Sequence, residues 1–155
     1  MAATIVYNTA RFDADGGSPI IHESPSGLSG DCLTYEVLAA QMSEAGDFSG
    51  ILAVPEGRRL LALAFTHEDM DGHATPTLDA DIVLRTLDSA GTATDTVLVN
   101  YSTGFTAAVT TPVVTLLGST IVPSSALGYG YIGFKVVAAA ATAAAGDVNL
   151  LVLWR

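Results

Sequence analysis

The sequence predicts an all-β protein, an antiparallel β-sandwich of the jelly-roll kind with about eight to ten short strands and an irregular N-terminal arm. Short apolar runs rich in Val, Ile, Thr and Tyr recur along the 155 residues. Turn residues separate these runs at intervals of roughly ten residues. No helical hydrophobic pattern recurs between them. Chains of this texture fold as antiparallel sandwiches or barrels and not as α/β proteins.

Two regions differ in texture along the chain. Residues 1–31 are expected to form a strand followed by an extended arm, and residues 32–155 are expected to form the sandwich. The arm carries two clusters of Asp, Gly, Ser and Pro, which favour turns, on either side of Ile20 and Ile21. Such a long connection is uncommon in a compact domain and is often functional, so we expect it to pack on a neighbouring subunit.

Alternation of apolar and polar residues, or a short apolar run bounded by Gly or Pro, predicts each strand of the sandwich. The expected strands are 32–38, 50–54, 58–66, 78–87, 96–101, 106–117, 120–122, 129–137 and 147–155. The strands 78–87 and 96–101 are expected to form a hairpin, because turn residues join them. Pro112 predicts that its segment lies at a sheet edge or is split in two, since proline donates no ladder hydrogen bond.

Other segments carry finer expectations. The strands 58–66 and 147–155 are apolar on both faces, which predicts central positions covered on both sides. Residues 39–45 can form one helical turn that ends at Gly46. Residues 138–145 are nearly all alanine, which favours a helix, but an isolated helix shorter than about 12 residues is marginal. A hairpin connection is therefore expected there, with a short helix as the alternative.

Charge is distributed unevenly. The net charge is −10, and Lys135 is the one charged side chain between Thr96 and Gly146. Soluble proteins normally carry charge on exposed surface, so the neutral stretch is expected to meet a neighbouring subunit. Aromatic residues are enriched at such interfaces. The expected interface residues are Ile5, Tyr7, Ile20, Ile21, Tyr129 and Tyr131.

Composition argues against several partners. Nucleic-acid binding needs clustered Lys and Arg, which one Lys and five scattered Arg cannot supply. No run reaches the ~18–20 apolar residues of a membrane helix. The N-terminus lacks the basic and apolar regions of a signal peptide, so synthesis and retention in a cytoplasm are expected. A single cysteine, Cys32, forms no intrachain disulfide.

The densest polar cluster lies between His67 and His73. Its candidate ligands for a divalent metal are His67, Asp69, Asp71 and His73. The alternative is an ordinary solvated loop, since the residue at the twelfth position of an EF-hand is not Glu and the histidines lack the spacing of a helical zinc site. No cofactor is therefore expected. No Gly-x-Ser-x-Gly motif or phosphate-binding loop appears either, and the chain is expected not to be an enzyme.

The chain resembles the head decoration (cement) proteins of tailed bacteriophages, small subunits built on jelly rolls or related sandwiches. The resemblance is carried by the Ala-, Thr-, Val- and Gly-rich strands of 78–122, the strand Gly-Tyr-Gly-Tyr-Ile-Gly-Phe-Lys at 128–135, and the ending Asn-Leu-Leu-Val-Leu-Trp-Arg at 149–155. It implies a non-enzymatic subunit of the virion, on the capsid surface and made in the host cytoplasm. Such a subunit is a homo-oligomer, with a trimer favoured, that binds the major capsid protein and stabilises the head. The acidity of residues 1–95 departs from this pattern.

Two other classes stay open. A carbohydrate- or receptor-binding sandwich of a virion fibre would carry aromatic residues at its loop tips, whereas Trp154 lies in the last predicted strand. A small cupin-like enzyme would carry His and Glu on neighbouring strands. The histidines here, His22, His67 and His73, fall in predicted loops.

Overall fold

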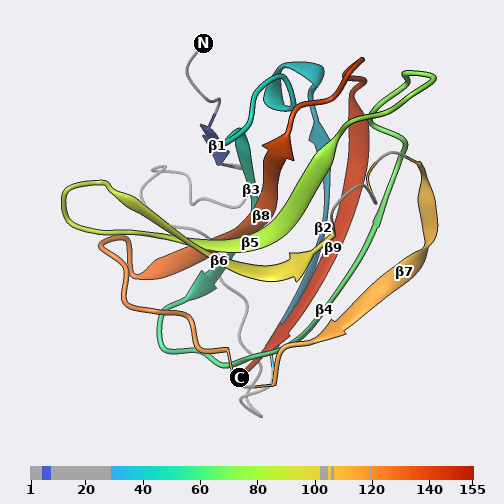
Figure 1. Cartoon of the computed structure of the whole chain (residues 1–155). Helices are drawn as coiled ribbons and strands as arrows, with labels where there is room; N and C mark the ends of the chain where they lie inside the picture. The colour runs from blue at the N-terminus through green and yellow to red at the C-terminus, as the bar shows by residue number, and fades with distance from the viewer. Residues whose placement is uncertain (1–4, 8–28, 102–104, 106, 119) are drawn as a thin grey trace.

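The computed structural model describes residues 5–7, 29–101, 105, 107–118 and 120–155. Within them the chain folds into nine strands in two sheets (Figure 1), which confirms the all-β sandwich. The strands are β1 (Ile5–Tyr7), β2 (Ser29–Val37), β3 (Phe48–Pro55), β4 (Leu60–His67), β5 (Asp79–Leu87), β6 (Ala93–Asn100), β7 (Val109–Leu116), β8 (Tyr129–Ala138) and β9 (Gly146–Trp154).

The strands pair in a nested order. β5 and β6 form the predicted hairpin, and around it β4 pairs with β7, β3 with β8 and β2 with β9, all antiparallel. The chain is thus one long two-stranded ribbon rolled up on itself, and the pairs β4–β9 and β5–β8 close the roll. The resulting sheets, β1-β3-β8-β5-β6 and β2-β9-β4-β7, have the arrangement of a jelly roll, with β1 added parallel to β3.

The core lies between the two sheets, and β9 shows how the sequence fills it. Alternate side chains of β9 are buried there: Val148, Leu150, Val152 and Trp154. Burying each aliphatic side chain of this kind contributes about 1.5–3 kcal/mol. The side chains between them point outward, and Leu151 is 37% exposed. The prediction of a central strand is confirmed, but the described part of the chain covers only one of its two faces.

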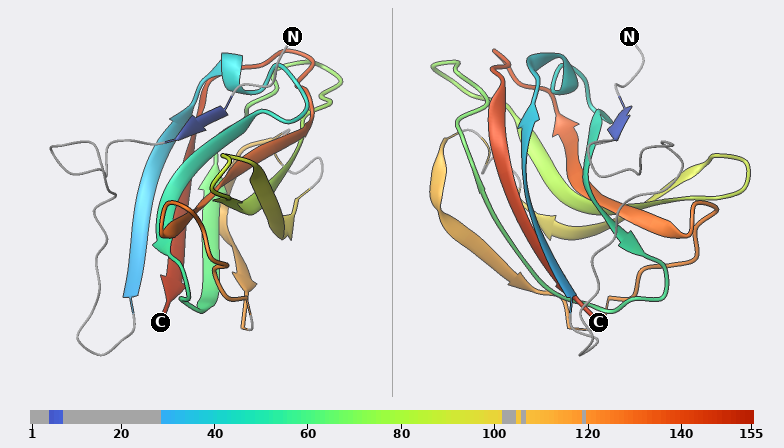
Figure 2. Two further views of the ribbon diagram at one scale, coloured as in Figure 1. Left: turned by 90° about the vertical axis from the view of Figure 1, so that its left-hand side faces the viewer. Right: turned by 180° about the vertical axis from the view of Figure 1, so that it is seen from behind.

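The predicted sheet positions of β4 and β7 are confirmed, but the predicted burial of β4 is confirmed on one face only. β4 is central, between β9 and β7, yet only one of its faces is fully buried. β7 lies at the margin of its sheet in Figure 2, as Pro112 predicted, and it runs through Pro112 without a break. Residues 120–122 form an isolated bridge, between Ile121 and Arg59, and not a strand of their own.

The alanine-rich connection after β8 is neither of the predicted structures. Its residues 139–145 contain no helix. β8 and β9 lie in different sheets, so the connection crosses between sheets and is not a hairpin. The predicted turn near residue 40 is present as a single 3-10 turn at Ala39–Gln41. Gly46 follows with a φ of 95°, a conformation that favours glycine.

The predicted arm lies largely outside the described residues, and so do Ile20 and Ile21. β2 begins at Ser29, inside the segment assigned to the arm. The division into residues 1–31 and 32–155 stays a prediction. Within the described part of the chain, no helix has the length and apolar character needed to cross a membrane.

Candidate functional site

The four candidate metal ligands do not converge. No group of three or more His, Cys, Asp or Glu side chains in the described ranges is placed to hold a metal ion. His67 and Asp71 are buried, at 3% and 1% exposure, whereas Asp69 and His73 lie on the exposed part of the loop. Of the two buried side chains, His67 packs in the core and Asp71 accepts hydrogen bonds from the backbone of neighbouring loops.

Asp71 holds two connections of the fold together. Its Oδ2 accepts hydrogen bonds from the backbone N–H groups of Thr77 (2.8 Å), Leu78 (3.0 Å) and Ala141 (3.0 Å). Its Oδ1 accepts one from Thr142 (2.9 Å) and a longer one from His73 (3.4 Å). Burial raises the pKa of this carboxyl, but the hydrogen bonds from Thr142, Thr77, Ala141 and Leu78 outweigh burial and hold the pKa well below its usual range. The carboxylate therefore fastens the β4–β5 loop to the β8–β9 connection.

His67 lies in a cluster of aromatic rings inside the sandwich. Its ring centroid is 4.3 Å from that of Phe105 and 5.6 Å from that of Tyr101. Its Nδ1 is 2.8 Å from the Glu68 carbonyl oxygen. That oxygen only accepts hydrogen bonds, so the proton is assigned to Nδ1. Nε2 has no hydrogen-bond partner among the described residues. Desolvation lowers the pKa of His67, against the opposing effects of the Glu68 carbonyl and the Asp69 charge.

We expect His67 to make folding stability depend on pH. Its pKa is lowered in the folded state, so the unfolded chain binds a proton more readily as pH falls below about 6.5. Stability should fall from pH 7.5 to 5.5, by at most about 1.4 kcal/mol per pH unit for this one group. The His67→Phe variant should lose that part of the slope in urea unfolding, whereas His73→Gln should keep it. Equal slopes in the wild type and His67→Phe would contradict the assignment.

Tyr129 and Tyr131 differ from the expectation of exposed interface aromatics. They are 7% and 4% exposed and form a second buried cluster with Phe48 and Val83, on the face of the larger sheet that points away from the main core. The two rings pack edge to face with centroids 5.4 Å apart. The prediction that they contact a neighbouring subunit is untested, but their rings are buried in the chain itself.

Charged side chains surround this second cluster. Asp95 receives hydrogen bonds from Arg85 Nε at 2.6 Å and lies 2.8 Å from Lys135 Nζ. Burial raises the pKa of Asp95, and the two cations together lower it below its usual range. The guanidinium of Arg85 also lies 4.0 Å from the centre of the Phe48 ring. The charge that the neutral stretch does carry, Lys135, is therefore part of an internal ion-pair network.

The outward face of the β2-β9-β4-β7 sheet is the surface that the sequence analysis missed. We call it the outer face. The strand registers arrange its apolar side chains in two neighbouring rows across the four strands. One row is Cys32, Leu151, Ala64 and Val114; the next is Gly30, Leu153, Ala62 and Leu116. Leu116 and Val114 are 83% and 64% exposed, and these rows form a broad aliphatic surface open to solvent.

Polar and charged side chains border the two apolar rows. On one side, Asn149 accepts a hydrogen bond from Thr34 Oγ1 and donates one to Thr66 Oγ1 at 3.1 Å. Beyond this polar row, Glu36 lies opposite Asp147 in the register. The other end of the outer face is basic, because Arg155 follows β9 and exchanges two backbone hydrogen bonds with Arg59.

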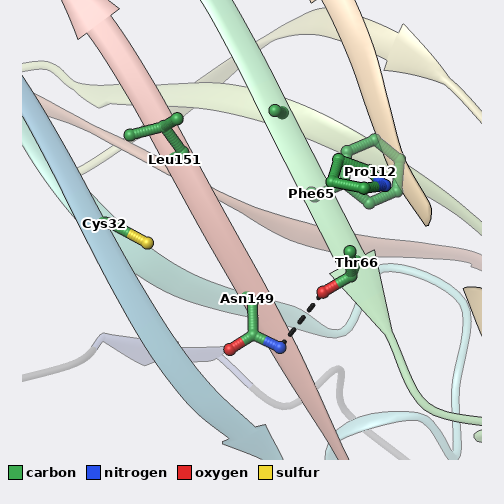
Figure 3. A pocket seen from close by; sticks show the side chains of 7 residues that line it. Cys32, Phe65, Thr66, Pro112, Asn149 and Leu151 are labelled. Carbon is green, nitrogen blue, oxygen red and sulfur yellow. Dashed lines mark hydrogen bonds between the residues drawn. The ribbon is translucent and has the colours of Figure 1, made fainter. Parts of the chain in front are cut away.

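A shallow groove of about 230 Å³ runs over the outer face (Figure 3). Its lining is almost wholly apolar, with Cys32 and Leu151 on one side of Asn149 and Thr66, and Pro112 across from them. No row of acids or bases converges on it, so the groove offers a surface for packing. The sequence did contain a pattern that could have revealed the outer face. In the alternating segment 147–155, Asp, Asn, Leu, Leu and Arg share one face of the strand.

Comparison with solved structures gives neighbours from phage capsids. A chain from the capsid of Ralstonia phage GP4 superposes with a TM-score of 0.61 at 16% identity, over 88% of each chain. A chain of the cyanophage Pam1 capsid asymmetric unit superposes with a TM-score of 0.54 at 20% identity, over 82% of this chain and 83% of that one. No family model matches the sequence, and no curated protein matches it. The chain therefore shares its fold with these capsid chains.

Proposed function

We propose that this chain is a structural protein of a phage virion, a decoration subunit that binds the major capsid protein on the capsid surface and stabilises the head. The observation that carries the proposal is the shared fold, which extends over 82% to 88% of this chain and as much of each capsid chain. The exposed aliphatic rows of the outer face support a role as a subunit of an assembly, because such patches mark interaction surfaces. The function needs no cofactor and no catalytic group. A homo-oligomer, with a trimer favoured by the resemblance, is part of this proposal.

The described residues do not favour the alternative functions. A cupin-like site would need histidines that share a cavity, whereas His67 is buried among rings and His73 lies on an exposed loop. A sugar-binding sandwich would present aromatic rings, but Trp154 and Tyr131 are buried.

Binding to capsids tests the proposal. We expect the purified chain to co-sediment with heads of the phage that encodes it, assembled without this subunit, and to saturate at a fixed number of copies per head. Decorated heads should withstand a higher temperature before they release DNA. A chain that stays in the supernatant at every ratio, while the major capsid protein is intact, would rule the proposal out.

A further inference from the structure

The outer face has a chemical order that makes it complementary to itself. Along β9 its side chains run from Asp147 through Asn149, Leu151 and Leu153 to Arg155. The ends of this series are about 26 Å apart, at about 3.3 Å per residue. The neighbouring strands repeat the order, with Glu36 beside Asp147 and Arg59 beside Arg155. A second copy laid on this face, with its strands reversed about the Leu151 row, places acid over base and the Leu151 row over its own copy. The Leu153 row then lies over the polar row of Asn149.

We propose that the outer face packs against the same face of a second copy of this chain, through a two-fold axis that runs across the strands along the Leu151 row. A two-fold contact uses the same patch on both copies. An axis across the strands brings the acidic end of each copy to the basic end of the other. An axis along the strands would instead stack acid on acid, and like charges in such a contact oppose association.

Two features of the outer face favour this occupant. Glu36 and Asp147 are direct neighbours across two strands, and like charges in that position destabilise a sheet unless a cation comes close. Arg155 of the second copy would supply that cation. The polar row can be covered without leaving groups unpaired, because Asn149 already bonds to Thr34 and Thr66.

Matched lysine substitutions test the contact. Val114 of the outer face is 64% exposed, and Val97 of β6, the edge strand of the other sheet, is 53% exposed. Both changes place a lysine on an exposed edge strand, so both variants are expected to fold. In the two-fold contact Val114 faces its own copy, so Val114→Lys brings two ammonium groups together in an apolar setting and should weaken the dimer at least about 100-fold. Val97→Lys should leave it unchanged.

Light scattering across a concentration series gives the readout. The expected result is a wild type with an even number of copies, which Val114→Lys halves and Val97→Lys does not. If three copies assemble through other surfaces, the wild type has six copies and Val114→Lys leaves three. A monomeric or three-copy wild type, or a mass that Val114→Lys leaves intact, would overturn the proposal whether or not the chain binds capsids.

The single cysteine reports on the direction of the axis. Cys32 is exposed and lies in the Leu151 row, so the proposed axis places it opposite Cys32 of the second copy, at about the 10 Å that separates packed sheets. A bis-maleimide of about that reach should link two copies, and Cys32→Ser should abolish the link. A two-fold axis along the strands, through the middle of the sheet, would move the two Cys32 side chains about 14 Å further apart, a distance of about three strand spacings. A dimer that is not linked through Cys32 would therefore refute the proposed arrangement.

Discussion

The Gly133→Ala variant is expected to lose at least about 3 kcal/mol of stability. Gly133 of β8 lies opposite Gly50 of β3, next to an irregularity in the register of that pair. A Cβ atom at Gly133 would lie 2.1 Å from the carbonyl oxygen of Ser49 and 2.8 Å from the Cα of Gly50. Both are backbone atoms, so no side-chain rotation relieves the contact and the central β3–β8 pair has to separate.

Thermal unfolding measures this effect, with an expected fall in Tm of roughly 6–12 °C for a chain of this length. Gly72→Ala is the matched control, because its Cβ would meet nothing within 4 Å, and its stability should stay within about 0.5 kcal/mol of the wild type. Gly130→Ala should fall between them, since its nearest contact, 2.7 Å, is the end of the Leu84 side chain. A fully stable Gly133→Ala would show that β3 and β8 do not approach as closely as described.

The Asp71→Asn variant is expected to lose about 3 kcal/mol. The amide group that replaces one carboxylate oxygen carries hydrogens that face backbone N–H donors, so donors of Thr77, Leu78 and Ala141, or that of Thr142, lose their acceptor in a buried setting. The hydrogen bonds that remain are accepted by a neutral amide oxygen in place of a carboxylate oxygen, so they are weaker. Urea unfolding at pH 7 provides the measurement.

Asp69→Asn controls for the change in charge on the same loop. Among the described residues Asp69 accepts one hydrogen bond, from the Asp71 N–H at 3.1 Å, and it is exposed, so we expect little loss. The effect of Asp71 should also depend on pH in a defined direction. Its pKa is depressed in the folded state, so its contribution is complete above about pH 4 and is lost as pH falls below that value. Equal stabilities of the Asp71→Asn and Asp69→Asn variants would contradict the role given to Asp71.

Local patterns in the sequence predicted the strands well. The hairpin of β5 and β6 was predicted because alternation and turn residues lie within one short segment, and Gly91 occupies the expected turn with a φ of 80°. Pro112 predicted an edge strand because proline has no backbone N–H to donate to a neighbouring strand, a property of that residue alone. Predictions of this kind need no knowledge of the rest of the chain.

The candidate site was harder to predict. The polar residues from His67 to His73 looked like ligands because their side chains are close in sequence, but the fold turns His67 into the core and surrounds Asp71 with backbone N–H groups from residues 77–78 and 141–142. Tyr129 and Tyr131 were expected at an interface because they are aromatic residues in a stretch with almost no charge, which is the profile of an interface core. Lys135 and Arg85 meet Asp95 beside them, and this network forms only when β5, β6 and β8 lie side by side.

The amino-acid sequence alone specified the β class, most strand positions and the set of residues that share each face of a strand, because these depend on periodicity and on turn chemistry within a few residues. It did not specify which faces are covered. The nested pairing brings β2 to β9 across more than a hundred residues. It also separates β8 from β9, although only seven residues connect them, six of which are alanine. Leu151 and Leu153 face solvent, and Tyr129 and Tyr131 are buried, because long-range pairing decides what each strand face meets.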